Sequence, residues 1–162
     1  LFNSIPSLTT CYRKDIYSNY LKDIHPEKLK WIMGDYPTWL YFALHSKVKF
    51  INEIQGAYRI LENSASHSNN VYKQLSFNES TCKVRMFYLS KRNDKGSHRL
   101  INKVIEEFLY AKFLLLLKSK MPLDDIYEDI RNSGIISFKM TFAYLIKYFY
   151  FLRFFLLIIP SK

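Results

Sequence analysis

Glycine, proline and cysteine are scarce in this chain, which has four Gly, five Pro and two Cys among 162 residues. Because Gly and Pro build most tight turns, few hairpins are available and we expect helix to dominate. Cys11 and Cys82 lie far apart and form no Cys-x-x-Cys pair. Cysteine usage therefore argues against a disulfide framework and favours a reducing compartment.

The common motifs that carry chemistry are also missing. The sequence has no glycine-rich phosphate loop, no nucleophile elbow and no zinc motif. His25, His45 and His98 stand at no metal-ligand spacing from one another or from the cysteines. The acidic pair Asp124-Asp125 follows Pro122, which starts a predicted helix. Acidic side chains in the first turn interact favourably with the helix dipole, so we do not assign this pair to a metal site. We therefore predict no metal site within this chain.

No charge-free apolar run reaches the roughly 18 residues that a membrane-spanning helix needs. The apolar stretch 135–159 is interrupted by Lys139, Lys147 and Arg153. At about 100° per residue these three charges share one helical face, opposite Phe, Leu and Ile. That pattern is typical of a helix in a membrane interface, with Lys and Arg reaching the headgroups. A core helix packed on its neighbours would show the same pattern, so both interpretations stay open.

Positive charge is plentiful and unevenly distributed. Lys and Arg number 24 against 14 Asp and Glu, and residues 71–162 hold 16 of these basic side chains and 8 of the acidic ones. Such an excess suits nucleic acid or an anionic membrane surface. The basic residues stand among aromatics and form no recognisable nucleic-acid module. We therefore expect a membrane surface, bound through residues 135–159, and no nucleic acid.

Local patterns predict three short strands, at residues 8–12, 48–51 and 54–60. They predict helices at residues 26–33, 36–45, 71–90 and 97–119, and another that begins at Pro122. The composition shifts at residues 64–70, which are rich in Ser and Asn. We expect a boundary there, with one unit over residues 1–68 and a second over residues 69–162.

Asp35 directly precedes a predicted helix, and two interpretations fit it. An Asp at this position is a good helix cap that stabilises by roughly 1 kcal/mol. A carboxylate at a helix entrance can also serve as a general base that takes a proton from a substrate hydroxyl. The two roles are compatible, because a capping carboxylate keeps one oxygen available.

Two arginines stand at the ends of predicted strands: Arg13 directly follows residues 8–12, and Arg59 lies near the end of residues 54–60. Open α/β folds place ligands at strand ends, and the planar guanidinium suits a diphosphate. Taken singly, each arginine is also consistent with a solvated surface charge. His67 lies in a Ser-rich loop and is a candidate only in combination with the other residues.

The run from Thr9 to His67 resembles the second half of the catalytic domain of family-two glycosyltransferases, which have the GT-A fold. The matching pieces are Leu8-Thr9-Thr10-Cys11-Tyr12-Arg13-Lys14, Gly34-Asp35-Tyr36-Pro37-Thr38-Trp39-Leu40, Ile51-Asn52-Glu53, Tyr58-Arg59 and Glu62-Asn63-Ser64-Ala65-Ser66-His67. The resemblance implies an α/β fold class: the latter half of a GT-A mixed sheet over residues 1–68, followed by a helical, membrane-associated extension.

The same resemblance implies an inverting transfer of sugar from a nucleotide-sugar donor to a hydroxyl of a glycan or lipid-linked acceptor. Asp35 would be the catalytic base, and the donor or acceptor would be bound by Arg13, Trp39, Arg59, Ser66 and His67. The family also implies a divalent cation, Mg or Mn, whose Asp-x-Asp ligands are not in this chain. We therefore expect the chain, which begins at Leu1, to be the acceptor-side portion of a longer protein.

A second hypothesis needs no catalysis: a basic helical protein that binds a membrane or a partner through its last helix. Both hypotheses place the protein in the cytoplasm, peripheral at the inner face of the cell membrane. They differ in whether Asp35 meets the two arginines at one site.

Overall fold

The computed structural model describes residue 5 and residues 7–57, 70–92 and 96–148. Regular structure in these residues consists of a short 3-10 helix, Ser7–Thr9, and seven α-helices. Their bounds are α1 Lys14–Ile24, α2 Pro26–Leu29, α3 Asp35–His45, α4 Val71–Ser90, α5 Ser97–Lys118, α6 Asp124–Ser133 and α7 Phe138–Leu145.

The predicted α/β fold class is wrong, because the described residues contain helices and no strand. Residues 8–12 hold the end of the 3-10 helix and a loop, and residues 48–51 and 54–57 form no strand ladder. β-propensity reflects packing against neighbouring strands, and these segments have no partner strand among the described residues. The rest of the third predicted strand, residues 58–60, lies outside the described part.

The predicted helices are mostly confirmed, except that the predicted helix at residues 135–159 is helical only over residues 138–145 of its described part, and residues 149–159 lie outside the described residues. The bounds of α4 match the predicted residues 71–90, and α5 and α3 match to within one residue. α6 begins just after Pro122 with Asp124 and Asp125 in its first turn, as expected for a helix dipole. The first predicted helix is shorter than expected, since Lys30 adopts a left-handed conformation directly after α2. α1 was not predicted, and residues 15–24 carried no prediction of regular structure.

The N-terminal helices pack on α4 through an aromatic core. Its buried members are Tyr20, Ile24, Met33, Tyr36, Trp39, Tyr41, Phe42, Val84 and Tyr88. Hydrogen bonds fix this contact: the Tyr88 hydroxyl donates to the carbonyl of Pro37 at 2.8 Å, and the Ile32 N–H donates to Ser80 Oγ at 3.0 Å. The N-terminal helices and α4 therefore share one core, although the predicted boundary at residues 68–69 separates them in the sequence.

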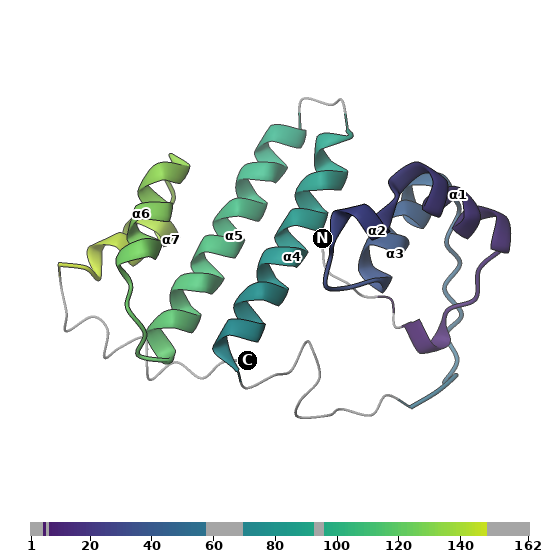
Figure 1. Cartoon of the computed structure of the whole chain (residues 1–162), viewed down its shortest axis with the longest axis horizontal. Coiled ribbons are helices and arrows are strands. Elements are labelled where there is room, and N and C mark those ends of the chain that lie inside the picture. Colours follow the sequence, from purple (N-terminus) through teal and green to yellow (C-terminus); the bar gives the residue numbers. More distant parts are fainter. Residues whose placement is uncertain (1–4, 6, 58–69, 93–95, 149–162) are drawn as a thin grey trace.

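α4 and α5 lie side by side, and α6 and α7 cover the other side of α5 (Figure 1). A second core forms there from Leu109, Phe113, Leu116, Leu117, Leu123, Ile126, Tyr127, Ile130, Met140, Ala143 and Ile146. Gly134 ends α6 in a left-handed conformation (φ 64°), which a residue without a Cβ adopts at little cost. The chain then turns back, and α7 packs against α5 and α6.

Candidate functional site

Asp35 is the first residue of α3 and is half-buried. Its Oδ1 accepts a hydrogen bond from the Tyr36 N–H at 2.7 Å, and its Oδ2 accepts one from Ser7 Oγ at 2.9 Å. Gly34 occupies the N-cap position, so the carboxylate stabilises the positive end of the helix from its first turn. Both oxygens of the predicted base are thus engaged within the chain.

The structure does not gather the other predicted site residues around Asp35. Arg13 is exposed at the N-cap position of α1, with its Nε 3.9 Å from Asp15 Oδ1. Trp39 is 7% exposed and packs edge-on against Phe42 in the aromatic core, so its ring offers no open face to a sugar.

Arg59, Ser66 and His67 lie in residues 58–69, outside the described part of the chain. The sheet whose strand ends were expected to present Arg13 and Arg59 is not formed by the residues that the structure describes. Among the residues that the structure describes, no cluster of three or more His, Cys, Asp or Glu side chains is suited to hold a metal ion. The divalent cation therefore stays an expectation from the resemblance.

A different region carries the more distinctive surface: residues 135–148, which we call the α7 surface. Ile136 is 95% exposed, Phe138 86% and Tyr148 66%, with Leu145 partly exposed beside them. Phe138 stacks on Phe142, with ring centroids 6.2 Å apart and planes 11° from parallel. The other side of α7, formed by Met140 and Ala143, is buried against the C-terminal core. Large apolar side chains thus project from an element whose inner face is firmly packed.

Two exposed lysines accompany this helix. At about 100° per residue, Lys139 lies about 100° from Phe138 around the helix axis, and Lys147 follows the end of α7 by two residues. The Nζ of Lys139 lies 5.6 Å from the centre of the Tyr110 ring, and that of Lys147 lies 5.6 Å from the centre of the Tyr127 ring. Cations over aromatic faces are held by the ring quadrupole. The two charges therefore lie over aromatic rings of α5 and α6, beside the exposed apolar side chains.

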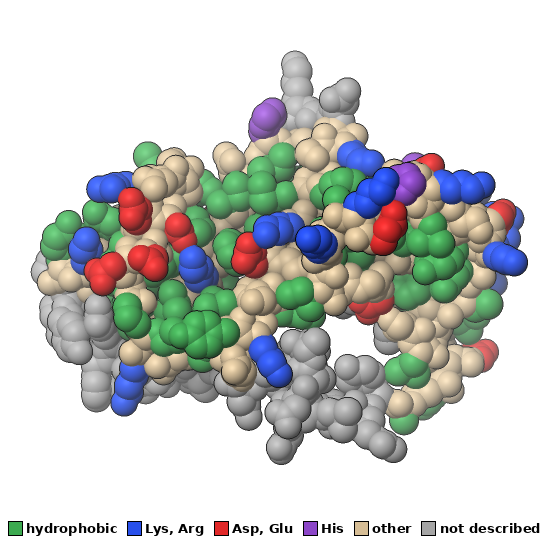
Figure 2. Space-filling model, viewed as in Figure 1, with side chains coloured by type: hydrophobic (Ala, Val, Ile, Leu, Met, Phe, Trp, Pro, Cys, Tyr) green, Lys and Arg blue, Asp and Glu red, His purple; other side chains and the backbone are tan. Residues whose placement is uncertain are grey.

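A shallow hollow of about 430 Å³ opens beside the α7 surface, between the end of α6 and α7. Its walls are mainly apolar, with Ile135, Met140 and Leu145 among them, and Arg131 stands in its lining. In the view of Figure 2, Asp and Glu side chains gather over the α6 end of the molecule, with Lys and Arg side chains around them. Arg131 is the one charged residue in the lining of the hollow among the described residues.

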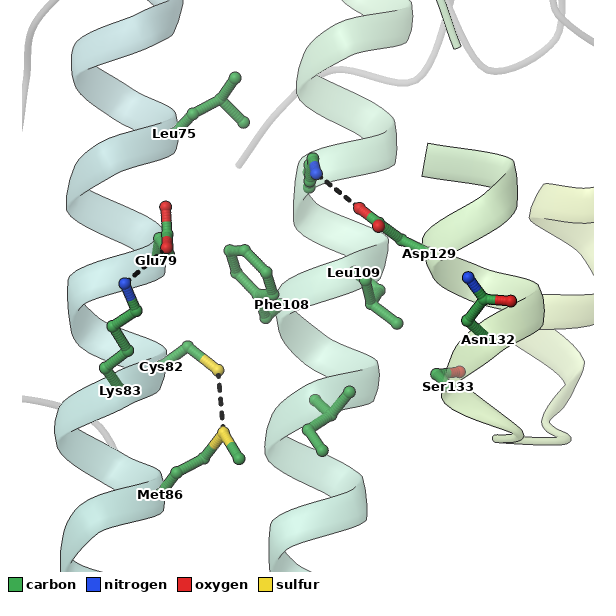
Figure 3. A pocket seen from close by; sticks show the side chains of 12 residues that line it. Leu75, Glu79, Cys82, Lys83, Met86, Phe108, Leu109, Asp129, Asn132 and Ser133 are labelled. Carbon is green, nitrogen blue, oxygen red and sulfur yellow. Dashed lines mark hydrogen bonds and ion pairs between the residues drawn. The ribbon is translucent and has the colours of Figure 1, made fainter. Parts of the chain in front are cut away.

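A larger groove, of about 510 Å³, lies between α4, α5 and α6 (Figure 3). Phe108 and Leu109 of α5 lie in the middle of this view, between the side chains of α4 and those of α6. Two ion pairs border it: Lys83 Nζ to Glu79 Oε1 at 2.7 Å, and Lys112 Nζ to Asp129 Oδ2 at 2.6 Å. Sequence reasoning missed this groove, because its residues come from three helices and share no local pattern.

Among the described residues, no helix has both the length and the apolar composition needed to cross a bilayer. Comparisons with protein-family models, with curated proteins and with solved structures find no match for this chain.

Proposed function

We propose that this protein is a non-catalytic helical protein that attaches to an anionic membrane surface through the α7 surface. The observation that carries the proposal is the exposure of Phe138 on the packed helix α7, with exposed Ile136 just before the helix and exposed Tyr148 just after it, and with Lys139 and Lys147 nearby. The inner face of the cell membrane, whose anionic lipids make it negative, is the surface that fits this charge.

The geometry matches what an interfacial helix requires. An apolar helix face enters the headgroup–acyl boundary by about 5–10 Å, and each large apolar side chain that leaves water gains roughly 1.5–3 kcal/mol. Lys139, on the face of α7 next to Phe138, and Lys147, just beyond the end of the helix, would then reach the level of the headgroups. α7 pairs part of its backbone within the helix, and Ser137 Oγ accepts a hydrogen bond from the Met140 N–H, so entering the interface leaves fewer peptide groups without partners than an irregular segment would.

Charge supplies the second contribution. The chain carries a formal net charge of +10, and an anionic surface attracts each nearby Lys or Arg by about 1 kcal/mol. This attraction is screened by salt over about 10 Å at 0.1 M ionic strength. Binding should therefore weaken as salt rises and should require acidic lipid.

Vesicle flotation tests the charge contribution. Protein is mixed with phosphatidylcholine vesicles that contain or lack phosphatidylserine, and the bound fraction is measured against lipid concentration. The double variant Lys139→Gln/Lys147→Gln should bind the acidic vesicles about 30-fold more weakly, which corresponds to about 1 kcal/mol for each charge.

Lys22→Gln/Lys28→Gln is the matched control, since it removes the same charge from exposed positions of α1 and α2. It should weaken binding only a few-fold, through the net charge. Equal losses in the two double variants would reject a localised α7 surface, and binding that ignores phosphatidylserine would reject the role of charge.

Inverting sugar transfer with Asp35 as base stays a prediction from the resemblance. The sheet that it presupposes is not formed by the described residues, and both Asp35 oxygens accept hydrogen bonds from the chain itself. For this reason the non-catalytic function is preferred.

A further inference from the structure

The geometry points to a ligand site in the groove between α4, α5 and α6, which would take a single uncharged alkyl chain that ends in a hydroxyl or amide. This site is separate from the α7 surface, and the inference does not rest on the proposed function. It follows from three properties of the groove: its apolar floor, its neutral rim and its size.

The floor of the groove is apolar and contains polarisable sulfur atoms. Leu75, Ile105 and Phe108 line it, together with Cys82 and Met86, whose sulfur atoms lie 3.8 Å apart (Figure 3). Cys82 is 8% exposed, and burial raises the pKa of its thiol, so it stays neutral around pH 7. Thiol and thioether groups behave as polarisable apolar surface that adapts to a flexible chain. Such a floor favours hydrocarbon.

The rim of the groove carries no net charge. Glu79 is paired with Lys83, and Lys112 is paired with Asp129. Each cation therefore already has a carboxylate, although the whole chain is strongly basic. A fatty acid or an alkyl amine would have to compete with these existing pairs for a counter-charge, whereas an uncharged head group needs none.

Asn132 of α6 supplies the polar contact. Asn132 is exposed and lines the groove, so its carboxamide stands at the solvent edge of the site. The amide offers both donors and an acceptor, which is what a hydroxyl or an amide head group requires. Figure 3 shows Asn132 on the same helix as Asp129 and Ser133, at the α6 side of the groove.

The size of the groove favours a chain over a partner helix. From Leu75 to Met86 the groove follows three turns of α4, or about 16 Å at 1.5 Å per residue. A helix of that length and about 10 Å across fills roughly 1,200 Å³, more than twice the 510 Å³ of the groove. A volume of this order is ordinary for a small-molecule pocket.

Methionine-methyl NMR with simple probes tests the inference. Dodecanol, dodecanoate and dodecylammonium are titrated into the labelled protein below their aggregation limits. Dodecanol should shift the Met86 signal in a saturable way and leave the Met33 signal unchanged, since Met33 lies in the N-terminal core. Shortening the alcohol should weaken binding about fourfold for each methylene removed, and decanol, which has two methylenes fewer than dodecanol, measures this dependence. Dodecanoate and dodecylammonium should each bind at least tenfold more weakly than dodecanol.

Two variants make the test specific. Leu75→Asn should weaken dodecanol at least tenfold, whereas Leu100→Asn, at a leucine of α5 that does not line the groove, should not. Asp129→Asn leaves Lys112 without its carboxylate, so dodecanoate should then bind at least tenfold more tightly than to the unchanged protein. A gain of this kind does not arise from simple misfolding.

Thiol labelling gives an independent measurement. Dodecanol should slow the alkylation of Cys82 and leave that of the exposed Cys11 unchanged. Equal binding of the three probes, shifts of Met33 as large as those of Met86, or no effect of Leu75→Asn would each overturn the inference.

Discussion

The two halves of the molecule both expose large apolar side chains, but on different backbones. In the N-terminal half, Phe50 is 84% and Ile54 99% exposed within residues 47–57. This segment has no regular structure, and among the described residues its internal backbone bonding is limited to the Glu53 N–H and the Ile51 carbonyl. In the C-terminal half, Phe138 and Leu145 are exposed on α7, an eight-residue helix that pairs part of its peptide groups internally.

Because of this difference, the exposure of apolar side chains alone does not decide whether a segment binds a membrane. Lysines accompany both segments, with Lys47 and Lys49 next to Phe50 and with Lys139 next to Phe138. Moving residues 47–57 into a bilayer interface would strip water from peptide groups that have no other partner. For α7 that cost is smaller. Equal apolar exposure therefore predicts unequal membrane affinity.

The cores of the two halves differ as well. In the N-terminal core the Tyr88 hydroxyl donates to a backbone carbonyl, and the Tyr41 hydroxyl donates to Asp23. The C-terminal core is mainly aliphatic, and the buried Tyr127 hydroxyl has no hydrogen-bond partner among the described residues. Directional bonds hold part of the first core, in which the buried Trp39 Nε1 also has no hydrogen-bond partner among the described residues, and close packing holds the second.

The largest expected effect is in the C-terminal core. Phe113 is completely buried there, so Phe113→Ala should lower the free energy of unfolding by about 3–5 kcal/mol. Leu100→Ala, at a leucine that is 40% exposed, should cost far less. Urea unfolding followed by circular dichroism measures both. A loss below about 1 kcal/mol for Phe113→Ala would show that this core is not closely packed.

Alkaline pH should act on the N-terminal core. Burial and then the neighbouring Asp23 raise the pKa of Tyr41 from 10 to about 12, and burial raises the pKa of Tyr20 and Tyr88. A hydroxyl that keeps its proton longer in the folded state contributes stability that is complete below pH 10 and is lost as pH rises towards 12. Urea unfolding between pH 8 and 12 should show this loss.

The Tyr41→Phe variant isolates the contribution of this hydroxyl. It should show a shallower decline in stability between pH 10 and 12, because the titrating group is gone. Identical declines in the variant and the unchanged protein would contradict the assignment to Tyr41.

A smaller effect compares one tyrosine hydroxyl from each core. Tyr88→Phe removes a buried hydrogen bond and should cost about 1 kcal/mol. Tyr127→Phe removes a buried hydroxyl without a described partner, so it should be neutral or stabilising. Paired urea titrations measure the difference. Equal losses would mean that hydrogen bonding does not distinguish the two cores.

The sequence predicts local features of this fold well and long-range ones poorly. Residues 71–90 and 97–118 form helices because periodicity and end signals act within a few residues; Asn70, for example, caps α4 by accepting from the Lys73 N–H at 3.1 Å. The predictions of strands at residues 8–12 and 48–51 were wrong, because a strand needs a partner strand, which local propensity does not reveal.

The candidate sites follow the same rule. The apolar and basic character of residues 135–148 was visible in the sequence, since one helix supplies it. The groove was not, because Leu75 and Asp129 are more than fifty positions apart and meet only in the folded chain. Trp39 was assigned to substrate binding, but its neighbours place it in a core.

The most direct test exchanges one phenylalanine in each half. Phe138→Ser and Phe50→Ser remove the same side chain from positions that are 86% and 84% exposed. Flotation with phosphatidylserine-containing vesicles should show at least tenfold weaker binding for Phe138→Ser and unchanged binding for Phe50→Ser. Equal binding by the two variants, or a larger loss for Phe50→Ser, would contradict the proposal that the α7 surface attaches this protein to a membrane.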